Sequence, residues 1–147
     1  VQTLASGSDN KFLLVWRPRT DQGSTTRCSY MKRRHMHDET FELDMDMADF
    51  RENGTSIGPE RYTVRANGDM MTIKRGSWKR EYTLVYSNYY SCYIFKRKHD
   101  KKCEVWAPSR RVRSALSSDC TVPFEHQCGK DAKSEYLSIN CQNRRTR

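Results

Sequence analysis

The sequence predicts an all-β protein, an eight-stranded antiparallel up-and-down barrel formed by a single domain over residues 1–147. Three observations predict it: short segments of alternating apolar and polar residues, tight-turn residues between these segments, and six cysteines. Strands in this order pair with their sequence neighbours, and a sheet of eight removes its exposed edges by closing on itself. A two-sheet sandwich is the main competing architecture.

The clearest strand lies at residues 41–48, where apolar and mostly acidic residues alternate. The apolar positions are Phe41, Leu43, Met45 and Met47, and the positions between them are Glu42, Asp44, Asp46 and Ala48. A period of two predicts a half-buried strand with one apolar and one acidic face. Three further strands are expected in this half of the chain, at Phe12–Arg17, Arg27–Met36 and Glu60–Ala66.

Tight turns separate the later strands. Asn67-Gly68 is the strongest hairpin signal, because a type I′ turn requires positive φ at both central positions. The strands that follow it are expected at Met70–Lys74, Tyr82–Tyr86, Ser91–Lys96 and Cys103–Ala107. After Pro108 the apolar spacing becomes weakly helical over residues 109–118 and 121–136, which predicts one or two short helices outside the barrel. A last short strand is expected at Leu137–Ile139.

The six cysteines predict a disulfide framework formed in an oxidising compartment. Their spacing contains no C-x-x-C pair of the kind that zinc sites use, and it leaves about 15 pairings open. No apolar run is long enough to span a bilayer, and the chain opens on Val1, as a processed product would. We therefore expect a secreted protein, with an N-glycosylation acceptor at Asn53-Gly54-Thr55.

The net charge of +9 raises the question of a nucleic-acid partner. The basic residues are spread along the chain, however, and no nucleic-acid-binding motif accompanies them. They include Lys32-Arg33-Arg34, Lys96-Arg97-Lys98, Arg110-Arg111 and a basic tail at residues 141–147. This distribution favours solvated basic faces and loops, with weak binding to sulfated glycans or anionic surfaces as the alternative. We expect no nucleic-acid partner and no membrane span.

No catalytic constellation is visible. The four histidines are scattered, and no G-x-S-x-G elbow is present. His35 and His37 could face one side of a strand, but they lack a complete set of metal ligands. Asp44 and Asp46 are more simply explained as the solvent-exposed face of a strand than as the catalytic carboxylate pair of a glycosidase. We therefore expect no enzyme, no metal site and no cofactor.

The C-terminal half contains a specific series of motifs. They are Val85-Tyr86-Ser87 leading to Cys92, Cys103-Glu104-Val105-Trp106, Asp119-Cys120, Val122-Pro123-Phe124 followed by Cys128, and Cys141. Over residues 82–141 the series resembles the tick salivary lipocalins, the group that includes the tick histamine-binding proteins. The general lipocalin G-x-W signature is incomplete, because Trp16 lacks the glycine. The resemblance implies the disulfides Cys28–Cys141, Cys92–Cys120 and Cys103–Cys128.

The resemblance also implies a role. Proteins of this group are secreted salivary scavengers that capture small host mediators in the barrel, stoichiometrically and without catalysis. One ligand class is the biogenic amines histamine and serotonin, and the other comprises leukotrienes, thromboxane and related lipids. An immunomodulatory lipocalin that binds a host protein or a glycan is a further alternative. We expect the chain to act as a monomer.

The residues around the cysteines favour the lipid class. Amine-binding relatives carry acidic residues where this chain has Tyr82 and Tyr93, although Glu104 is kept and Glu60 could match a further acid. The resemblance and the strand pattern together nominate ligand-binding residues in the interior: Phe41, Met45, Tyr82, Leu84, Tyr86, Tyr93, Phe95, Glu104 and Trp106. Arg80 at the barrel mouth, or Lys79 or Arg17, could pair with a carboxylate head group. The competing interpretation is that these side chains simply fill the barrel.

Overall fold

The computed structural model describes residues 10–17, 26–37, 42–51, 56–88, 91–115, 118–129 and 135–136. The main strands are β1 (Lys11–Arg17), β2 (Thr26–His37), β3 (Glu42–Arg51), β4 (Ser56–Asn67), β5 (Met70–Arg75), β6 (Trp78–Ser87), β7 (Tyr93–Arg97) and β8 (Cys103–Pro108). They are followed by the 3₁₀ turn η1 (Ser109–Arg111), the helices α2 (Val112–Ala115) and α3 (Ser118–Cys128), and β9 (Glu135–Tyr136).

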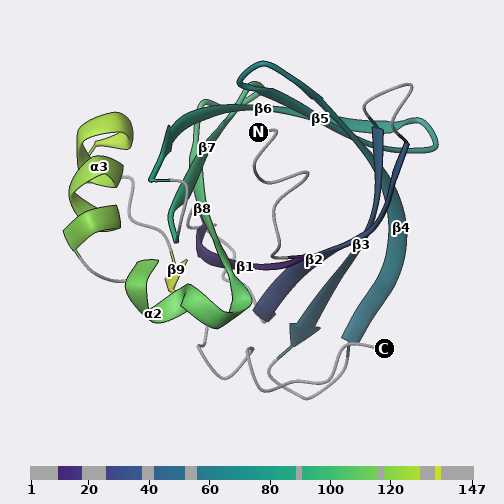
Figure 1. The fold of residues 1–147 in the computed structure, drawn as a ribbon, viewed down its shortest axis with the longest axis horizontal. Helices are drawn as coiled ribbons and strands as arrows, with labels where there is room; N and C mark the ends of the chain where they lie inside the picture. Colours follow the sequence, from purple (N-terminus) through teal and green to yellow (C-terminus); the bar gives the residue numbers. More distant parts are fainter. Residues whose placement is uncertain are drawn as a thin grey trace.

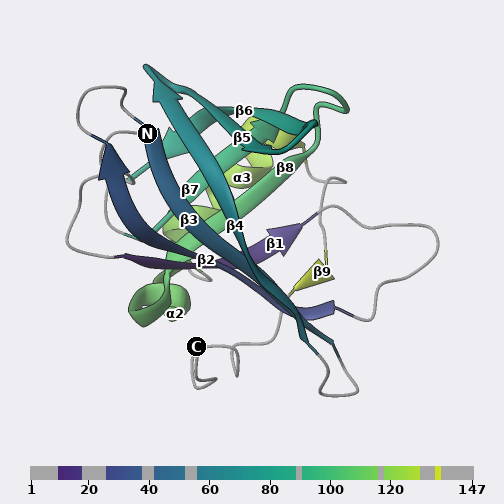
Figure 2. The ribbon, with the colours of Figure 1, turned by 90° about the vertical axis from the view of Figure 1, so that its right-hand side faces the viewer.

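The eight main strands form a closed antiparallel barrel, which confirms the predicted fold class (Figure 1). Each strand from β2 to β8 pairs with its sequence neighbours, and β1 pairs with both β2 and β8. Phe12, for example, lies opposite Met31 on one side and Pro108 on the other. The short strand β9 pairs with the end of β1 (Figure 2). It directly precedes the last strand expected from the sequence, Leu137–Ile139, which lies outside the described residues.

The helical segment lies outside the barrel, as expected. The described residues of 109–118 form η1, α2 and the first residue of α3, and α3 ends at Cys128 because Gly129 adopts φ +90°. Two of the implied disulfides, Cys92–Cys120 and Cys103–Cys128, connect α3 to the barrel. The implied Cys28–Cys141 bond lies outside the described residues. None of the described helices is long and apolar enough to cross a membrane.

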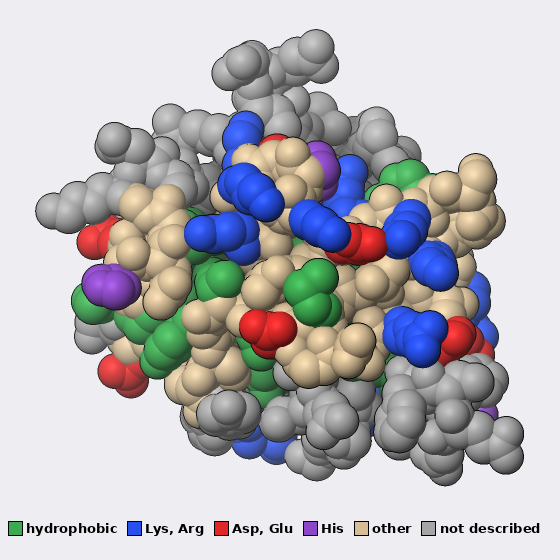
Figure 3. All heavy atoms as spheres, turned by 90° about the horizontal axis from the view of Figure 1, so that it is seen from above, with side chains coloured by type: hydrophobic (Ala, Val, Ile, Leu, Met, Phe, Trp, Pro, Cys, Tyr) green, Lys and Arg blue, Asp and Glu red, His purple; other side chains and the backbone are tan. Residues whose placement is uncertain are grey.

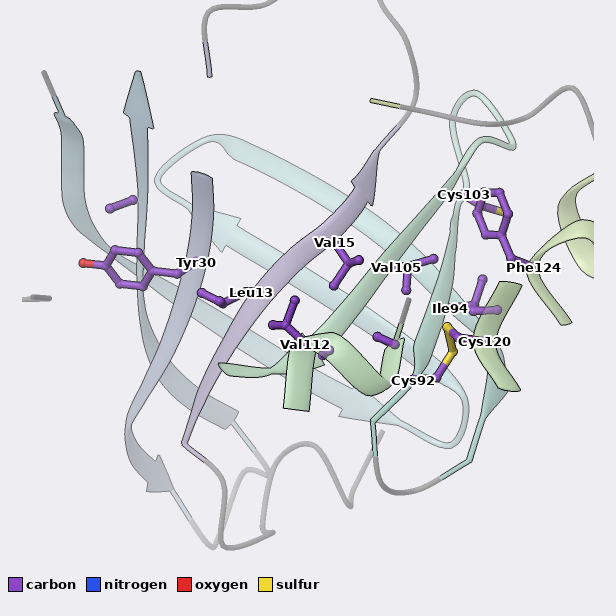
Figure 4. Close-up of a cluster of buried hydrophobic side chains, with 13 residues drawn as sticks. Leu13, Val15, Tyr30, Cys92, Ile94, Cys103, Val105, Val112, Cys120 and Phe124 are labelled. Carbon is purple, nitrogen blue, oxygen red and sulfur yellow. A yellow bond between two sulfur atoms is a disulfide. The ribbon is translucent and has the colours of Figure 1, made fainter. Parts of the chain in front are cut away.

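The sheet separates two apolar clusters, because successive side chains of a strand point to opposite faces. The outer cluster fills the space between the barrel and the helices and includes Leu13, Val15, Ile94, Val105 and Phe124 (Figure 4). The inner cluster lies inside the barrel and includes Phe12, Met31, Met45, Val64, Met71 and Phe95. Because inward and outward side chains alternate along β1 and β7, each of these strands contributes side chains to both clusters.

The acidic face predicted for β3 is present on the outside of the barrel. Asp46 accepts hydrogen bonds from the Nε atoms of Arg34 and Arg61, each at 2.6 Å. Burial alone would raise the pKa of Asp46, but these two arginines outweigh it and lower the pKa below its usual value. The aspartate therefore stays ionised and joins three adjacent strands, β2, β3 and β4, through one ion cluster.

Gly58 is required where β4 runs beside a bulge in β3. It adopts φ +87°, and a Cβ atom there would lie 2.8 Å from the carbonyl oxygen of Met47. Gly68, in the β4–β5 turn, has a similar φ of +61° but open space around it. Alanine substitutions at the two glycines therefore separate two free-energy costs, that of a left-handed backbone conformation and that of a steric collision.

We predict that Gly68→Ala lowers the free energy of unfolding by about 1–2 kcal/mol, the cost of a left-handed conformation for a residue with a side chain. Gly58→Ala should cost clearly more, because the backbone of β3 must also move. Urea unfolding of both variants measures the difference, and equal losses would contradict the close approach of the two strands.

Candidate ligand-binding site

A cavity of about 280 Å³ lies inside the barrel, at the end where β5 turns into β6 and β7 into β8. The volume is near the lower limit of about 300–1,000 Å³ for small-molecule sites. Its apolar lining comes from Leu14, Met47, Tyr62, Trp78 and Trp106. Its charged and hydroxyl groups come from Glu60, Arg80, Tyr82, Arg97 and Glu104, with Ser29, Tyr30 and Ala48 completing the wall.

The opposite half of the interior is filled by side chains. Phe12, Met31, Met45, Met71 and Phe95 are each at most 2% exposed. Their rings and thioethers pack against Tyr93, whose ring meets Phe12 edge to face at 6.0 Å between centroids. Among the described residues, the interior of the barrel is therefore partly filled, with the cavity in the half opposite this packed cluster.

Glu104 is buried in the cavity wall, and both of its carboxylate oxygens accept hydrogen bonds. Its Oε2 accepts a hydrogen bond from Arg97 Nε at 2.6 Å, and its Oε1 accepts one from Trp106 Nε1 at 3.0 Å. Arg97 also contacts Asp100 in the β7–β8 turn at 3.3 Å. Because burying an unpaired carboxylate is costly, the ion pair with Arg97 offsets the cost of placing Glu104 inside the barrel.

Arg80 differs from the other cations of the cavity. It is half-buried, donates a hydrogen bond to the hydroxyl group of Tyr82, and stacks over Trp78 at 5.3 Å from the ring centroid. Among the described residues it forms no ion pair with a carboxylate, whereas Arg97 pairs with Glu104 and Arg75 pairs with Glu60. Its charge is therefore available to a ligand.

An aromatic pair stands at the mouth of the cavity. The rings of Tyr62 and Trp78 meet edge to face with 5.6 Å between centroids. Arg75 lies over the other side of Tyr62 at 5.7 Å, and Trp78 is 43% exposed to solvent. The two rings thus separate the inner cavity from a shallow outer hollow lined by Arg75, Gly76 and Ser77.

The structure distributes the predicted ligand-binding residues among several places. Arg80, Tyr82, Glu104 and Trp106 line the cavity. Met45, Tyr93 and Phe95 lie in the filled half of the interior, and Leu84 packs against the same inner cluster. Phe41 lies outside the described residues.

Tyr86 requires a correction, because it packs against the outer cluster and does not face the interior. A β-bulge between Leu84 and Tyr86 shifts the register of β6, so that Tyr86 lies opposite the outward-facing Ile94. Simple alternation along the strand placed Leu84 and Tyr86 on one face, and the inserted residue breaks this alternation.

Several cavity residues were missed from the sequence. Arg97 was assigned to a solvated basic run, yet it lies two positions after Phe95 on the inward face of β7. Trp78 lies before the strand that was expected at Tyr82–Tyr86, although the period of two that contains Tyr82 and Arg80 extends back to it. Extending each alternating pattern to the turn residues would have identified both positions.

No metal site is found in the described part of the chain, where no group of three or more His, Cys, Asp or Glu residues converges. The cavity therefore offers charged groups, hydroxyl groups and aromatic rings as its means of recognition. An arrangement of this kind suits reversible binding of a small organic molecule.

The chain matches the family model of the tick histamine binding protein over residues 1–143. It belongs to this family. No curated protein sequence gives a significant match. Among similar solved structures, AM182 in a serotonin complex has a TM-score of 0.72 at 20% identity, covering 95% of this chain and 90% of AM182.

Two further similar structures are lipocalins or allergens. The cockroach allergen Per a 4 has a TM-score of 0.66 at 14% identity, covering 92% of this chain and 88% of the allergen. The siderocalin Ex-FABP, described as having dual ligand specificities, has a TM-score of 0.59 at 14% identity, covering 90% and 95%. At these identities the likeness shows the lipocalin fold, which agrees with the closed barrel of the family member described here.

We predict that Arg97→Met lowers the free energy of unfolding by about 3–5 kcal/mol, because it leaves a buried carboxylate without its partner. The double variant Arg97→Met/Glu104→Gln should recover a large part of this loss, since the uncompensated charge is then removed. Urea unfolding of both single variants and the double variant measures the coupling. Additive losses would show that the two residues act independently.

A second prediction concerns Tyr82. Burial, with a smaller contribution from the charge of Glu104, raises the pKa of its hydroxyl group well above the usual value. The unfolded chain therefore loses this proton near pH 10 while the folded chain keeps it, so this contribution to stability declines as the pH rises above about 10. Unfolding of wild type and Tyr82→Phe between about pH 9 and pH 11 should show a steeper decline for wild type. Parallel curves would contradict the burial of a neutral hydroxyl.

Proposed function

We propose that this lipocalin is a secreted scavenger of a small amphipathic host mediator with an apolar body and an anionic head group. A fatty-acid-derived mediator such as a leukotriene or thromboxane has this chemistry. The observation that carries the proposal is the half-buried Arg80 in the cavity wall, which has no carboxylate partner among the described residues. Small-ligand binding itself follows from membership of the family and from the barrel.

The electrostatics of the cavity favour an anion. Arg97 is held by Glu104 and Asp100, and Arg75 is held by Glu60, so both carboxylates of the lining already have cationic partners. A carboxylate that enters the cavity can accept charge-assisted hydrogen bonds from Arg80 without breaking an existing ion pair. The Tyr82 hydroxyl group, held beside Arg80, offers a second polar contact to the same head group.

The apolar part of the ligand would contact Leu14, Met47 and Trp106. The cavity is small for a long acyl chain, but the adjoining filled region contains Met31, Met45 and Met71. Methionine side chains are flexible and repack readily around apolar partners. These side chains could therefore make room for a chain longer than the cavity seen in the free protein.

A biogenic amine is the second candidate, and two observations favour it. The cavity contains the carboxylates of Glu60 and Glu104, and a similar solved structure is a serotonin complex. An ammonium group would nevertheless have to displace a guanidinium from either carboxylate, with the loss of a short ion pair. The anionic ligand avoids this cost, and we therefore rank it first.

Secretion is part of the proposal. Two disulfides are present in the described residues, and such bonds form and persist in oxidising compartments. Capture would be stoichiometric, so the protein would act by its abundance at the site and not by turnover. N-glycosylation at Asn53 and a monomeric state remain predictions, since Asn53 lies outside the described residues.

We predict that Arg80→Gln weakens binding of a fatty-acid mediator by about ten-fold or more, because a charge-assisted hydrogen bond contributes roughly 1.5–3 kcal/mol. The methyl ester of the same lipid, which lacks the anionic group, should bind wild type and Arg80→Gln alike. Titration calorimetry with leukotriene B4 and its ester measures both effects. Arg113→Gln, an exposed change on α2 that removes the same charge, is the matched control.

The same titrations with histamine and serotonin test the second candidate. Tight amine binding that is lost in Glu104→Gln, together with no response to leukotriene B4, would overturn the proposal in favour of an amine scavenger. Native mass spectrometry of protein secreted from eukaryotic cells gives an independent check, because a lipid captured during expression would add a stoichiometric mass.

A further inference from the structure

The outer surface near the mouth of the barrel is strongly basic. Five exposed lysines lie on β5, on β6 and in the β7–β8 turn, and we call them the basic face: Lys74, Lys79, Lys98, Lys101 and Lys102. Figure 3 shows Lys and Arg side chains forming a band across this side of the molecule with few acidic side chains among them. The sequence alone, in which these lysines are up to 28 positions apart, did not predict this grouping.

The strand register brings like charges together. Lys74 lies directly opposite Lys79 in the β5–β6 pair, an arrangement that destabilises a sheet unless something compensates it. The nearby compensating group is Glu81, whose carboxylate contacts the Nζ atoms of Lys79 at 3.0 Å and Lys98 at 2.9 Å. One carboxylate thus contacts two of the five ammonium groups of the basic face, so the face keeps an excess of positive charge.

The basic face contains a hollow that could receive an anionic group. A surface depression of about 410 Å³ is lined by Lys79, Arg80, Glu81, Lys98 and His99. Two lysines line the hollow, and Glu81 is its one acidic residue. The lysines that line it have exposed side chains, 53% for Lys79 and 61% for Lys98, so a polymer lying on the surface can reach them.

We propose that the basic face binds a linear sulfated polysaccharide. Proteins that bind single-stranded nucleic acids supply several aromatic rings on which successive bases stack. The hollow offers the imidazole of His99 alone, and the outward residues beside it, such as Thr72 and Thr83, supply no ring. Membrane-surface sites combine basic residues with apolar side chains that enter the lipid. Trp78, an exposed tryptophan nearby, lies on the opposite face of β6 and packs against Tyr62.

Binding of this kind would retain the scavenger near the extracellular matrix, where its ligand is released. It uses surface charges only, so it leaves the inner cavity free to bind its own ligand. The interaction should weaken steeply with salt, because each ammonium group that meets a sulfate releases a bound counterion.

The test compares two variants that lose the same charge. Lys74→Gln/Lys79→Gln/Lys98→Gln removes three positive charges from the basic face, and Arg144→Gln/Arg145→Gln/Arg147→Gln removes three from the C-terminal tail. Dissociation constants for heparin are measured at several salt concentrations. The lysine variant should bind about ten-fold more weakly or worse and lower the salt slope by about three, while the tail variant should change much less.

A variant with the opposite expected effect on heparin binding keeps the test decisive if the triple variant fails to fold. Glu81→Gln removes the acidic group of the hollow and should strengthen heparin binding. Circular dichroism verifies the fold of each variant. Equal weakening by the lysine and tail variants would overturn the proposal, because it would reduce the interaction to net charge. No change in Glu81→Gln would also overturn it, because it would show that the hollow does not contact the polysaccharide.

Two further measurements separate this proposal from its alternatives. Vesicles containing phosphatidylserine and a single-stranded oligonucleotide should each bind more weakly than heparin, and tighter binding of either one would overturn the assignment to a polysaccharide. Tyr82→Phe, which alters the cavity without changing the net charge, should bind heparin as wild type does. Failure of mediator binding to Arg80 would therefore leave the result for the basic face unaffected.

Discussion

β1 pairs with β2 along one side and with β8 along the other, and the rest of the molecule depends on this double pairing. It removes the free edges of the sheet and divides every strand into inward and outward residues. One set of side chains fills or lines the barrel, and the other meets the helices, the disulfides or solvent. The cavity, the outer cluster and the basic face are all consequences of this separation.

Inside the barrel, the pairing of charges decides which charged groups remain available to a ligand. A low-polarity interior accepts an ionised group only with a partner, and the cavity meets this requirement by joining Glu104 to Arg97 and Glu60 to Arg75. These pairs occupy the carboxylates that an amine would need. Arg80 is held by a hydroxyl group and an aromatic ring and has no carboxylate partner among the described residues, which is why we propose an anionic ligand.

The two faces of β6 give the protein two separate means of recognition. Arg80 and Tyr82 point inward to the cavity, while Lys79 and Glu81 point outward to the basic face. Neighbouring positions on one strand thus serve a small ligand inside and a polymer outside. Because the sheet lies between them, each site can change in evolution without rebuilding the other.

Local patterns in the sequence determined the strands, the Asn67-Gly68 turn, the closed barrel and, through the family resemblance, the Cys92–Cys120 and Cys103–Cys128 bonds. These features depend on residue spacing, which a linear sequence displays directly. Tertiary structure alone decided that Tyr86 faces outward, since a bulge is invisible to a period of two. It also decided that Arg97 pairs with Glu104 and that, among the described residues, side chains fill one half of the barrel and leave a cavity in the other. Those outcomes depend on how side chains from different strands meet in space, and no pattern along a single strand contains that information.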